Sequence, residues 1–276
     1  MVVEDAVAFP CNDWRMKAVF CPLLILLLAS VSLQAVEVTQ PQGAVRVYPT
    51  MFDLKGNKVA TADYTQQVNG NELRVRSVYR FIKGGEIEEK ATFRQEANLI
   101  QKTWSWRETK DKTLQRSYEV DFDAGRATAR KLENGRMREY SDRIRVKPGQ
   151  TFAGFGFTLA LENLRHRLIK GGPIDLEGVG FNPGPIVVPV RLSYLGTERL
   201  VISGRSVNAE RFKLQPQVPA IAKLFIKVPD THIWLTPPPS TLLRWEGPLV
   251  EPDDTIARVE LSPSGDSGPP KPAGAR

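Results

Sequence analysis

Few side chains in this sequence have the types and spacing that acid–base or metal chemistry requires. Asp121 and Asp123 share one face of a predicted strand beside a turn, where paired carboxylates could bind a cation or transfer protons. The same pair also fits a solvated strand face opposite arginines. His166 and His232 are the only histidines, and neither belongs to an HExxH or HxH pattern. We therefore expect no metal site.

The tetrapeptide Gly265-Asp-Ser-Gly268 contains the residue types that surround a serine-protease nucleophile. Such a serine needs a histidine base, an orienting aspartate and oxyanion-hole donors on a rigid loop. Ser267 stands instead in a low-complexity tail, and P-loop, GxGxxG and GxSxG motifs are absent. We expect no catalytic residues and no cofactor. A hydrolase that works through carboxylates stays an open alternative, because Asp and Glu leave no local motif.

The elements that would position any site are mainly strands. Between Asn71 and Phe81, apolar and charged residues alternate with a period of two, which is typical of a strand with one buried and one solvated face. The same alternation returns at Ile87, Ala91 and Phe93, at Trp104 and Trp106, and at Tyr118, Val120 and Phe122. Asp123-Ala-Gly125 and Glu133-Asn-Gly135 predict hairpin turns between such strands.

One helix is predicted within this β pattern. Phe157, Leu161, Leu164 and Leu168 are spaced four, three and four residues apart, which places them on one helical face. Gly171-Gly172 can end the helix. Further strands are expected at 186–194, 198–202, 207–214 and 256–261, and a hairpin at 232–245, while 220–228 fits either a helix or a strand. The predicted fold class is mainly β, an antiparallel meander that forms a barrel or half-barrel with one principal α-helix.

The N-terminal region predicts export. Met16-Lys17 precedes an apolar run that continues to Leu33, as in a secretory signal peptide, and cleavage is expected after Ser32 or after Ala35. The run is also long enough to span a bilayer, so an uncleaved anchor is the alternative. Acidic residues before Met16 make Met16 an alternative start. We expect a signal peptide at 1–35, a single β-rich domain at 36–261 and a disordered tail at 262–276.

Cysteine usage and charge limit the environment and the partners. Both cysteines, Cys11 and Cys21, lie in the predicted signal peptide, so the mature chain has no disulfide and no thiolate metal site. The formal charge is +7. On the predicted strands, however, most arginines lie on the face opposite the aromatic residues, which is a poor platform for nucleic acid. We expect a periplasmic or secreted monomer that does not bind nucleic acid.

The apolar faces of the predicted strands and helix provide a candidate ligand site. If the helix covers a curved sheet incompletely, the gap between them is a pocket; if it covers the sheet fully, the same residues form a filled core. The sequence leaves both alternatives open. The predicted ligand-binding residues are Tyr79, Phe81, Phe93, Trp104, Trp106, Phe157, Leu161 and Leu164.

Several segments resemble a known family. Tyr118-Glu-Val-Asp-Phe, Val190-Arg-Leu-Ser-Tyr-Leu-Gly-Thr-Glu and Trp234-Leu-Thr-Pro-Pro-Pro, in this order, are similar to a family of exported bacterial envelope proteins of unknown function. The similarity covers roughly residues 59–261. More remotely, the chain resembles the half-barrel-plus-helix plan of periplasmic lipoprotein carriers. These resemblances imply the fold and supply no catalytic residues.

The sequence favours a non-catalytic envelope protein that binds or carries an amphipathic, lipid-like ligand. The first alternative is a structural or protein-interaction module of the envelope with an envelope protein as partner. The second alternative is the carboxylate-dependent hydrolase. Composition, spacing and resemblance do not identify the ligand.

Overall fold

The structure is a computed structural model that describes residues 34–217 and 228–262. These residues belong to one compact unit, Leu33–Arg276. The apolar run of the predicted signal peptide, most of the ambiguous segment 220–228 and the predicted tail from residue 263 onward lie outside the described residues. Within the described ranges, no helical segment combines the length and apolarity that a membrane crossing requires.

The described residues form one large sheet and one α-helix, so the predicted mainly β fold class is confirmed. The first strand is β1 (Val45–Val47). A meander of hairpins follows: β2 (Thr50–Phe52), β3 (Lys58–Asn69), β4 (Glu72–Phe81), β5 (Glu86–Gln95), β6 (Leu99–Lys110), β7 (Thr113–Asp121), β8 (Arg126–Glu133) and β9 (Arg136–Arg143). The helix α1 (Gly156–Gly171) follows the short β10 (Thr151–Phe152). The remaining strands are β11 (Ile174–Phe181), β12 (Pro185–Ile202), β13 (Arg205–Pro216), β14 (Thr231–Leu235), β15 (Leu242–Pro248) and β16 (Ile256–Glu260).

The strand order connects the C-terminal strands to the start of the meander through β16. The path runs from β10 to β16, then to β2, and continues in sequence order to β9, while β1 pairs with β3. All pairings are antiparallel except β10 with β11. In the described part of the chain, β9 and β10 end the path without pairing with each other. The sheet is therefore a half-barrel rather than a closed barrel.

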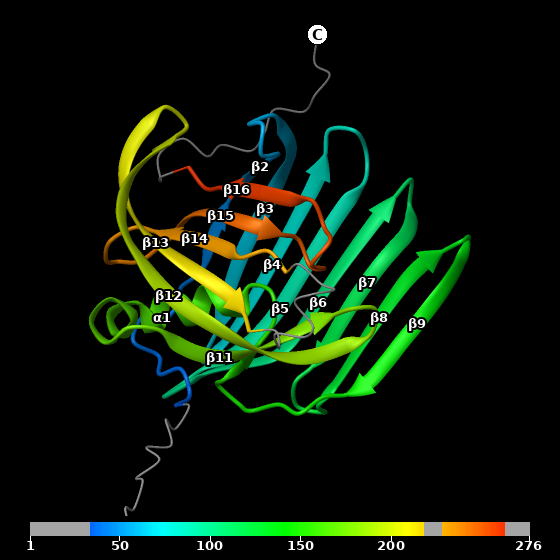
Figure 1. The fold of residues 1–276 in the computed structure, drawn as a ribbon, viewed down its shortest axis with the longest axis horizontal. Coiled ribbons are helices and arrows are strands. Elements are labelled where there is room, and N and C mark those ends of the chain that lie inside the picture. Colours follow the sequence, from blue (N-terminus) through cyan, green and yellow to red (C-terminus); the bar gives the residue numbers. More distant parts are fainter. Residues whose placement is uncertain (1–33, 218–227, 263–276) are drawn as a thin grey trace, which may run out of the picture. The chain divides into compact units, whose positions relative to one another are not determined.

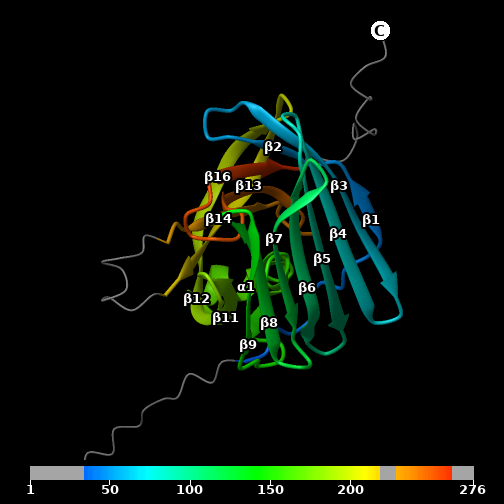
Figure 2. The ribbon, with the colours of Figure 1, turned by 90° about the vertical axis from the view of Figure 1, so that its right-hand side faces the viewer.

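The sheet curves around α1. Figures 1 and 2 show the helix between the β11–β12 hairpin and the long strands β4–β7. Register shifts interrupt the ladders at five places, and such bulges bend strands and increase their twist. The shifts lie between Met51 and Phe52, Thr92 and Phe93, Glu108 and Thr109, Tyr194 and Gly196, and Trp234 and Leu235. The bulge in β12 joins two predicted strands into one long strand.

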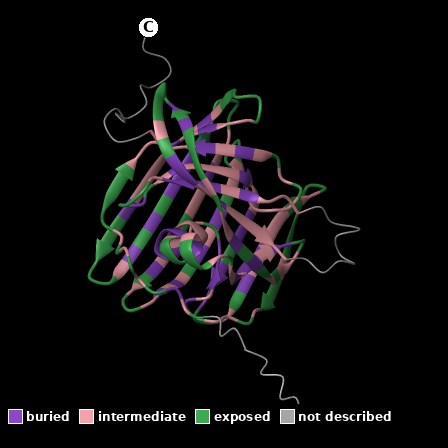
Figure 3. Cartoon of the chain, turned by 60° about the vertical axis from the view of Figure 1, so that its left-hand side comes forward, coloured by how far each residue is buried: buried purple, intermediate pink, exposed green. Residues whose placement is uncertain are grey.

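Local sequence explains the hairpins and the strand faces. At the β8–β9 turn, Asn134 and Gly135 have φ values of 51° and 74°, the left-handed conformation expected of Asn-Gly. Along β4, Leu73 and Tyr79 are buried, while Arg74 and Arg76 are exposed. Figure 3 shows this alternation of buried and exposed residues along the long strands.

The core lies between α1 and the concave face of the sheet. Leu161, Leu164 and Leu168 of the helix pack with strand residues such as Phe93 and Leu73 in one hydrophobic cluster. Full burial of a side chain of this size stabilises the fold by about 1.5–3 kcal/mol. The helix is therefore fixed against the sheet by its apolar face, as its spacing predicts.

Candidate functional site

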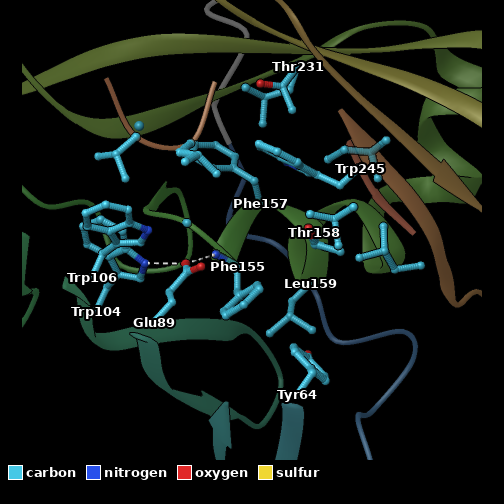
Figure 4. A pocket seen from close by; sticks show the side chains of 18 of the residues that line it. Tyr64, Glu89, Trp104, Trp106, Phe155, Phe157, Thr158, Leu159, Thr231 and Trp245 are labelled. Carbon is cyan, nitrogen blue, oxygen red and sulfur yellow. Dashed lines mark hydrogen bonds between the residues drawn. The ribbon is translucent and has the colours of Figure 1, made fainter. Parts of the chain in front are cut away.

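A cavity of about 520 Å³ lies between the start of α1 and the two halves of the curved sheet. Its walls come from β3–β6, from the first turns of α1 and from β11–β15. Figure 4 shows aromatic and aliphatic side chains of these elements around the space. The volume falls within the range of about 300–1,000 Å³ that is typical of small-molecule sites. The concave face is therefore a filled core in one part and a pocket in another.

Four of the predicted ligand-binding residues line this cavity: Tyr79, Trp104, Trp106 and Phe157. Trp104 stacks on Phe181 with ring centroids 6.1 Å apart, and Trp106 packs against Tyr118 with centroids 5.6 Å apart. These ring contacts pack the two tryptophans against neighbouring aromatic side chains, one of which, Phe181, also lines the cavity.

The other four predicted residues do not line the cavity. Phe93 and Leu161 have no exposed surface, and Leu164 keeps 2%. Their side chains pack in the interface between α1 and the sheet. Leu161 and Leu164 lie beyond the first turn of α1, and the cavity lies beside that first turn. Phe81, at the end of β4, is half-buried and packs at the border of the same core. The helical and strand periods identify the inner face, but they do not distinguish its packed part from its open part.

Glu89 is a carboxyl group on the wall of this apolar cavity. Its Oε1 accepts hydrogen bonds from Trp104 Nε1 at 2.7 Å and from the backbone N–H of Phe155 at 3.2 Å, as Figure 4 shows. Phe155 is the N-cap residue of α1, and its side chain makes no cap hydrogen bond. Glu89 thus caps the helix from a neighbouring strand. Burial raises the pKa of Glu89 to about 7, and the two donors limit this rise.

The loop before α1 is held against the sheet by Gln101, in addition to Glu89. Gln101 of β6 donates to the carbonyl of Ala153 at 3.0 Å and accepts from its N–H at 2.8 Å. Gly154 has a φ of 49°, and a Cβ atom there would overlap with Glu89 Oε1 and Trp104 Nε1. A glycine is required at this position because the backbone passes directly over the Glu89–Trp104 pair.

Glu162 is the second carboxyl group on the cavity wall. It lies on α1 with 8% of its surface exposed, and its Oε2 accepts a hydrogen bond from Gln42 Nε2 at 2.8 Å. Burial raises the pKa of Glu162 to about 8. Tyr64 lies near both glutamates, and its hydroxyl accepts a hydrogen bond from Gln66 at 2.6 Å. In the described residues, neither Glu89 nor Glu162 forms an ion pair.

The segment before β1 helps to form this part of the site. Thr39 and Gln40 donate their backbone N–H groups to Asn163 Oδ1 at 2.8 and 2.9 Å. Asn163 also donates to the carbonyl of Leu159 at 2.8 Å. One helix side chain thus anchors the chain that leads to Gln42, and thereby places the partner of Glu162.

Sequence reasoning missed both glutamates, although a signal existed for one. Glu89 lies two residues from both Ile87 and Ala91, so the period of the strand puts it on the inner face. Glutamate is usually exposed to solvent, so the period of two alone did not lead us to predict Glu89 on the inner face. Glu162 follows Leu161 on α1, and no local signal marks it as a cavity residue.

The residues that the sequence offered for acid–base or metal chemistry lie elsewhere. Asp121 Oδ1 accepts a hydrogen bond from the N–H of Ala124 at 2.9 Å and stabilises the β7–β8 turn, while Asp123 pairs with Lys102. His166 lies on the exposed side of α1, and His232 lies on β14 beside Trp234. No group of three potential metal ligands comes together in the residues that the structure describes. The Ser267 tetrapeptide lies outside them.

No protein-family model matches this sequence, and no curated protein matches it either. Among solved structures, a β-barrel-like protein of domain of unknown function DUF1849 from Brucella abortus is similar. It is 10% identical, with a TM-score of 0.44 over 80% of this chain and 97% of that chain. The hypothetical lipoprotein YmcC from Escherichia coli K12 is 8% identical, with a TM-score of 0.36 over 80% of this chain and 85% of that chain. Similarities this distant transfer no residue roles to this chain.

Proposed function

We propose that this protein is a non-catalytic, exported protein of the bacterial envelope that binds an amphipathic ligand in the cavity between α1 and the sheet. The single observation that carries the proposal is the cavity of about 520 Å³ with its aromatic and aliphatic walls. An apolar space of this size gains free energy by taking up an apolar chain, at roughly 0.8 kcal/mol for each buried methylene group.

The arrangement of the walls supports a binding role. Trp104, Trp106 and Phe157 offer large apolar surfaces, and Glu89 and Glu162 offer hydrogen-bonding groups on the walls. A mostly apolar pocket with a few polar groups is the usual form of a small-molecule site. The export signal predicted at 1–35 supports the placement in the envelope. The protein acts as a monomer, with the ligand as its partner.

A dye-displacement assay with a cavity-reducing variant tests the proposal. Gly180 lines the cavity, and a Cβ atom there would meet no other atom closer than 3.9 Å, so Gly180→Leu adds volume without an immediate clash. We expect a neutral naphthylamine dye to bind the wild-type protein saturably and Gly180→Leu to weaken this binding about tenfold.

The matched control is Val201→Leu, which adds one methylene group at a position of the β12–β13 hairpin that is 64% exposed. This variant should bind the dye like the wild type. Absence of saturable binding to the wild type, or equal affinity in Gly180→Leu and Val201→Leu, would contradict the proposal.

A further inference from the structure

Among the described residues, the cavity wall contains acidic side chains and no basic ones. Of the described residues on its walls, Glu89 and Glu162 carry ionisable carboxyl groups, and none is a lysine, arginine or histidine. Carriers of fatty acids or phospholipids face anionic head groups, which a cationic or strongly hydrogen-donating site would neutralise. The ionisable carboxyl groups of this cavity cannot neutralise an anionic head group.

Arg116 is a basic side chain that contacts the aromatic wall, and it is already engaged in ion pairs. Arg116 stacks on Trp106 with its guanidinium carbon 4.9 Å from the ring centroid. Its nitrogens donate to Glu108 Oε2 and Asp254 Oδ1, each at 2.6 Å. Arg116 is not among the residues that line the cavity. This guanidinium is therefore neutralised outside the cavity and offers no charge to a ligand inside it.

Both carboxyl groups keep an oxygen for a ligand. The hydrogen bonds from Trp104 and Phe155 both end on Glu89 Oε1, and Gln42 donates to Glu162 Oε2. Within the described ranges, Glu89 Oε2 and Glu162 Oε1 accept no hydrogen bond. Neither atom is among the buried polar atoms that are sealed from contact and lack a partner. These two oxygens are therefore accessible acceptors on the wall of the cavity.

We propose that the cavity selects an amphiphile whose polar end donates hydrogen bonds and carries no negative charge, such as a long-chain amine or alcohol, with this end at Glu89 or at Glu162. The inference rests on the proposed function and adds the chemical class of the ligand. An ammonium or hydroxyl group donates to the free carboxyl oxygens. Above about pH 8, where both glutamates are ionised, a carboxylate or phosphate in the same place would lie beside an acidic group without a cation, at a large desolvation cost.

The phenols around the site fit this chemistry. Tyr64 and Tyr79 are the other titratable groups on this wall, and burial raises the pKa of both hydroxyls above their ordinary value. They stay neutral throughout the physiological range and add no charge. The recognition of charge thus depends on the two glutamates.

A matched series of single-chain ligands tests the selectivity. Dodecylamine, dodecanol and dodecanoate share one chain length and differ at the polar end. Displacement of the neutral dye at about pH 9, where both glutamates are ionised, therefore compares the head groups directly. We expect the amine and the alcohol each to bind at least about tenfold more tightly than the carboxylate. Equal or tighter binding of dodecanoate would overturn the inference and leave the proposed function standing.

Glutamine variants assign the selectivity to the two residues. Glu89→Gln/Glu162→Gln keeps the acceptor oxygens for Trp104, Phe155 and Gln42 but removes both charges. We expect the gap between amine and carboxylate to shrink to roughly threefold or less in this variant. Glu119→Gln on the exposed face of β7 makes one of the same charge changes outside the cavity and should keep the full gap. A full gap in the double variant would overturn the inference, whereas failure of all three ligands and of the dye to bind would overturn the proposed function itself.

Discussion

Glu89 and Glu162 are carboxyl groups in an environment that disfavours their charge. Each has hydrogen-bond donors on one oxygen and apolar cavity walls nearby. Burial raises the pKa of Glu89 to about 7 and that of Glu162 to about 8, because the charged forms lose water without gaining a cation. Groups of this kind lower the stability of the fold at high pH, and such strain at a cavity is more consistent with a ligand site than with a purely structural core.

The two glutamates predict a specific dependence of stability on pH. In the unfolded chain both ionise near the ordinary value of 4.5, whereas in the folded protein they hold their protons to about pH 7 and 8. Between these limits the folded state binds more protons, so the free energy of unfolding falls as the pH rises and levels off above about pH 8. Tyr64 and Tyr79 stay neutral over this range.

Urea denaturation at about pH 5 and about pH 9 measures this effect. Glu89→Gln/Glu162→Gln should lose less stability than the wild type between the two conditions, because Gln does not titrate. Glu119→Gln serves as the control and should follow the wild type. An equal loss in the wild type and in the double variant would assign the pH dependence to other groups.

At the scale of elements, the site depends on the junction between β10 and α1. Gln101 holds Ala153, Glu89 caps Phe155, and Gly154 lies against the pair of Glu89 and Trp104. Strands β5 and β6 therefore position the start of the helix, and the start of the helix closes one side of the cavity.

Gly154→Ala tests this junction. The positive φ of 49° and the overlap with Glu89 and Trp104 should together lower the free energy of unfolding by about 2–4 kcal/mol. Gly70→Ala is a matched control, since Gly70 has a φ of 59° with open space around the missing Cβ. It should lose only about 1 kcal/mol, the conformational part. If urea denaturation gave the same loss of unfolding free energy for Gly154→Ala and Gly70→Ala, the overlap at the junction would be relieved without an energetic cost and the prediction would be wrong.

The elements were largely predictable from the sequence, and the cavity was not. Alternation identified the inner faces of β4–β7, Asn134-Gly135 identified a turn, and the spacing of Phe157 to Leu168 identified α1. These signals are local, since they depend on periods of two and 3.6 residues. The border between packed core and open cavity depends instead on how two sheet halves and a helix meet. Phe93 and Leu161 therefore have the inward-facing spacing that Trp104 also has, but they lie in the packed core and Trp104 lines the cavity.

At the scale of the whole molecule, a sheet in which β16 pairs with β2 and whose two edges, β9 and β10, stay unpaired with each other curves around α1 and leaves a space beside it in the described part of the chain. The half-barrel provides an apolar interior larger than α1 fills. This mismatch between the sheet and the helix α1 is the structural basis of the proposed binding function. The central claim is that the remaining space holds an amphiphile in the living cell.

Native mass spectrometry of the mature protein, purified from its own envelope without detergent exchange, tests that claim most directly. We expect an additional lipid-sized mass that is lost on denaturation and that belongs to a molecule with an amine or hydroxyl end. We also expect a smaller bound fraction in Gly180→Leu than in Val201→Leu. If the purified protein carries no such mass and also fails to bind the neutral dye, the claim that the cavity holds an amphiphile is wrong.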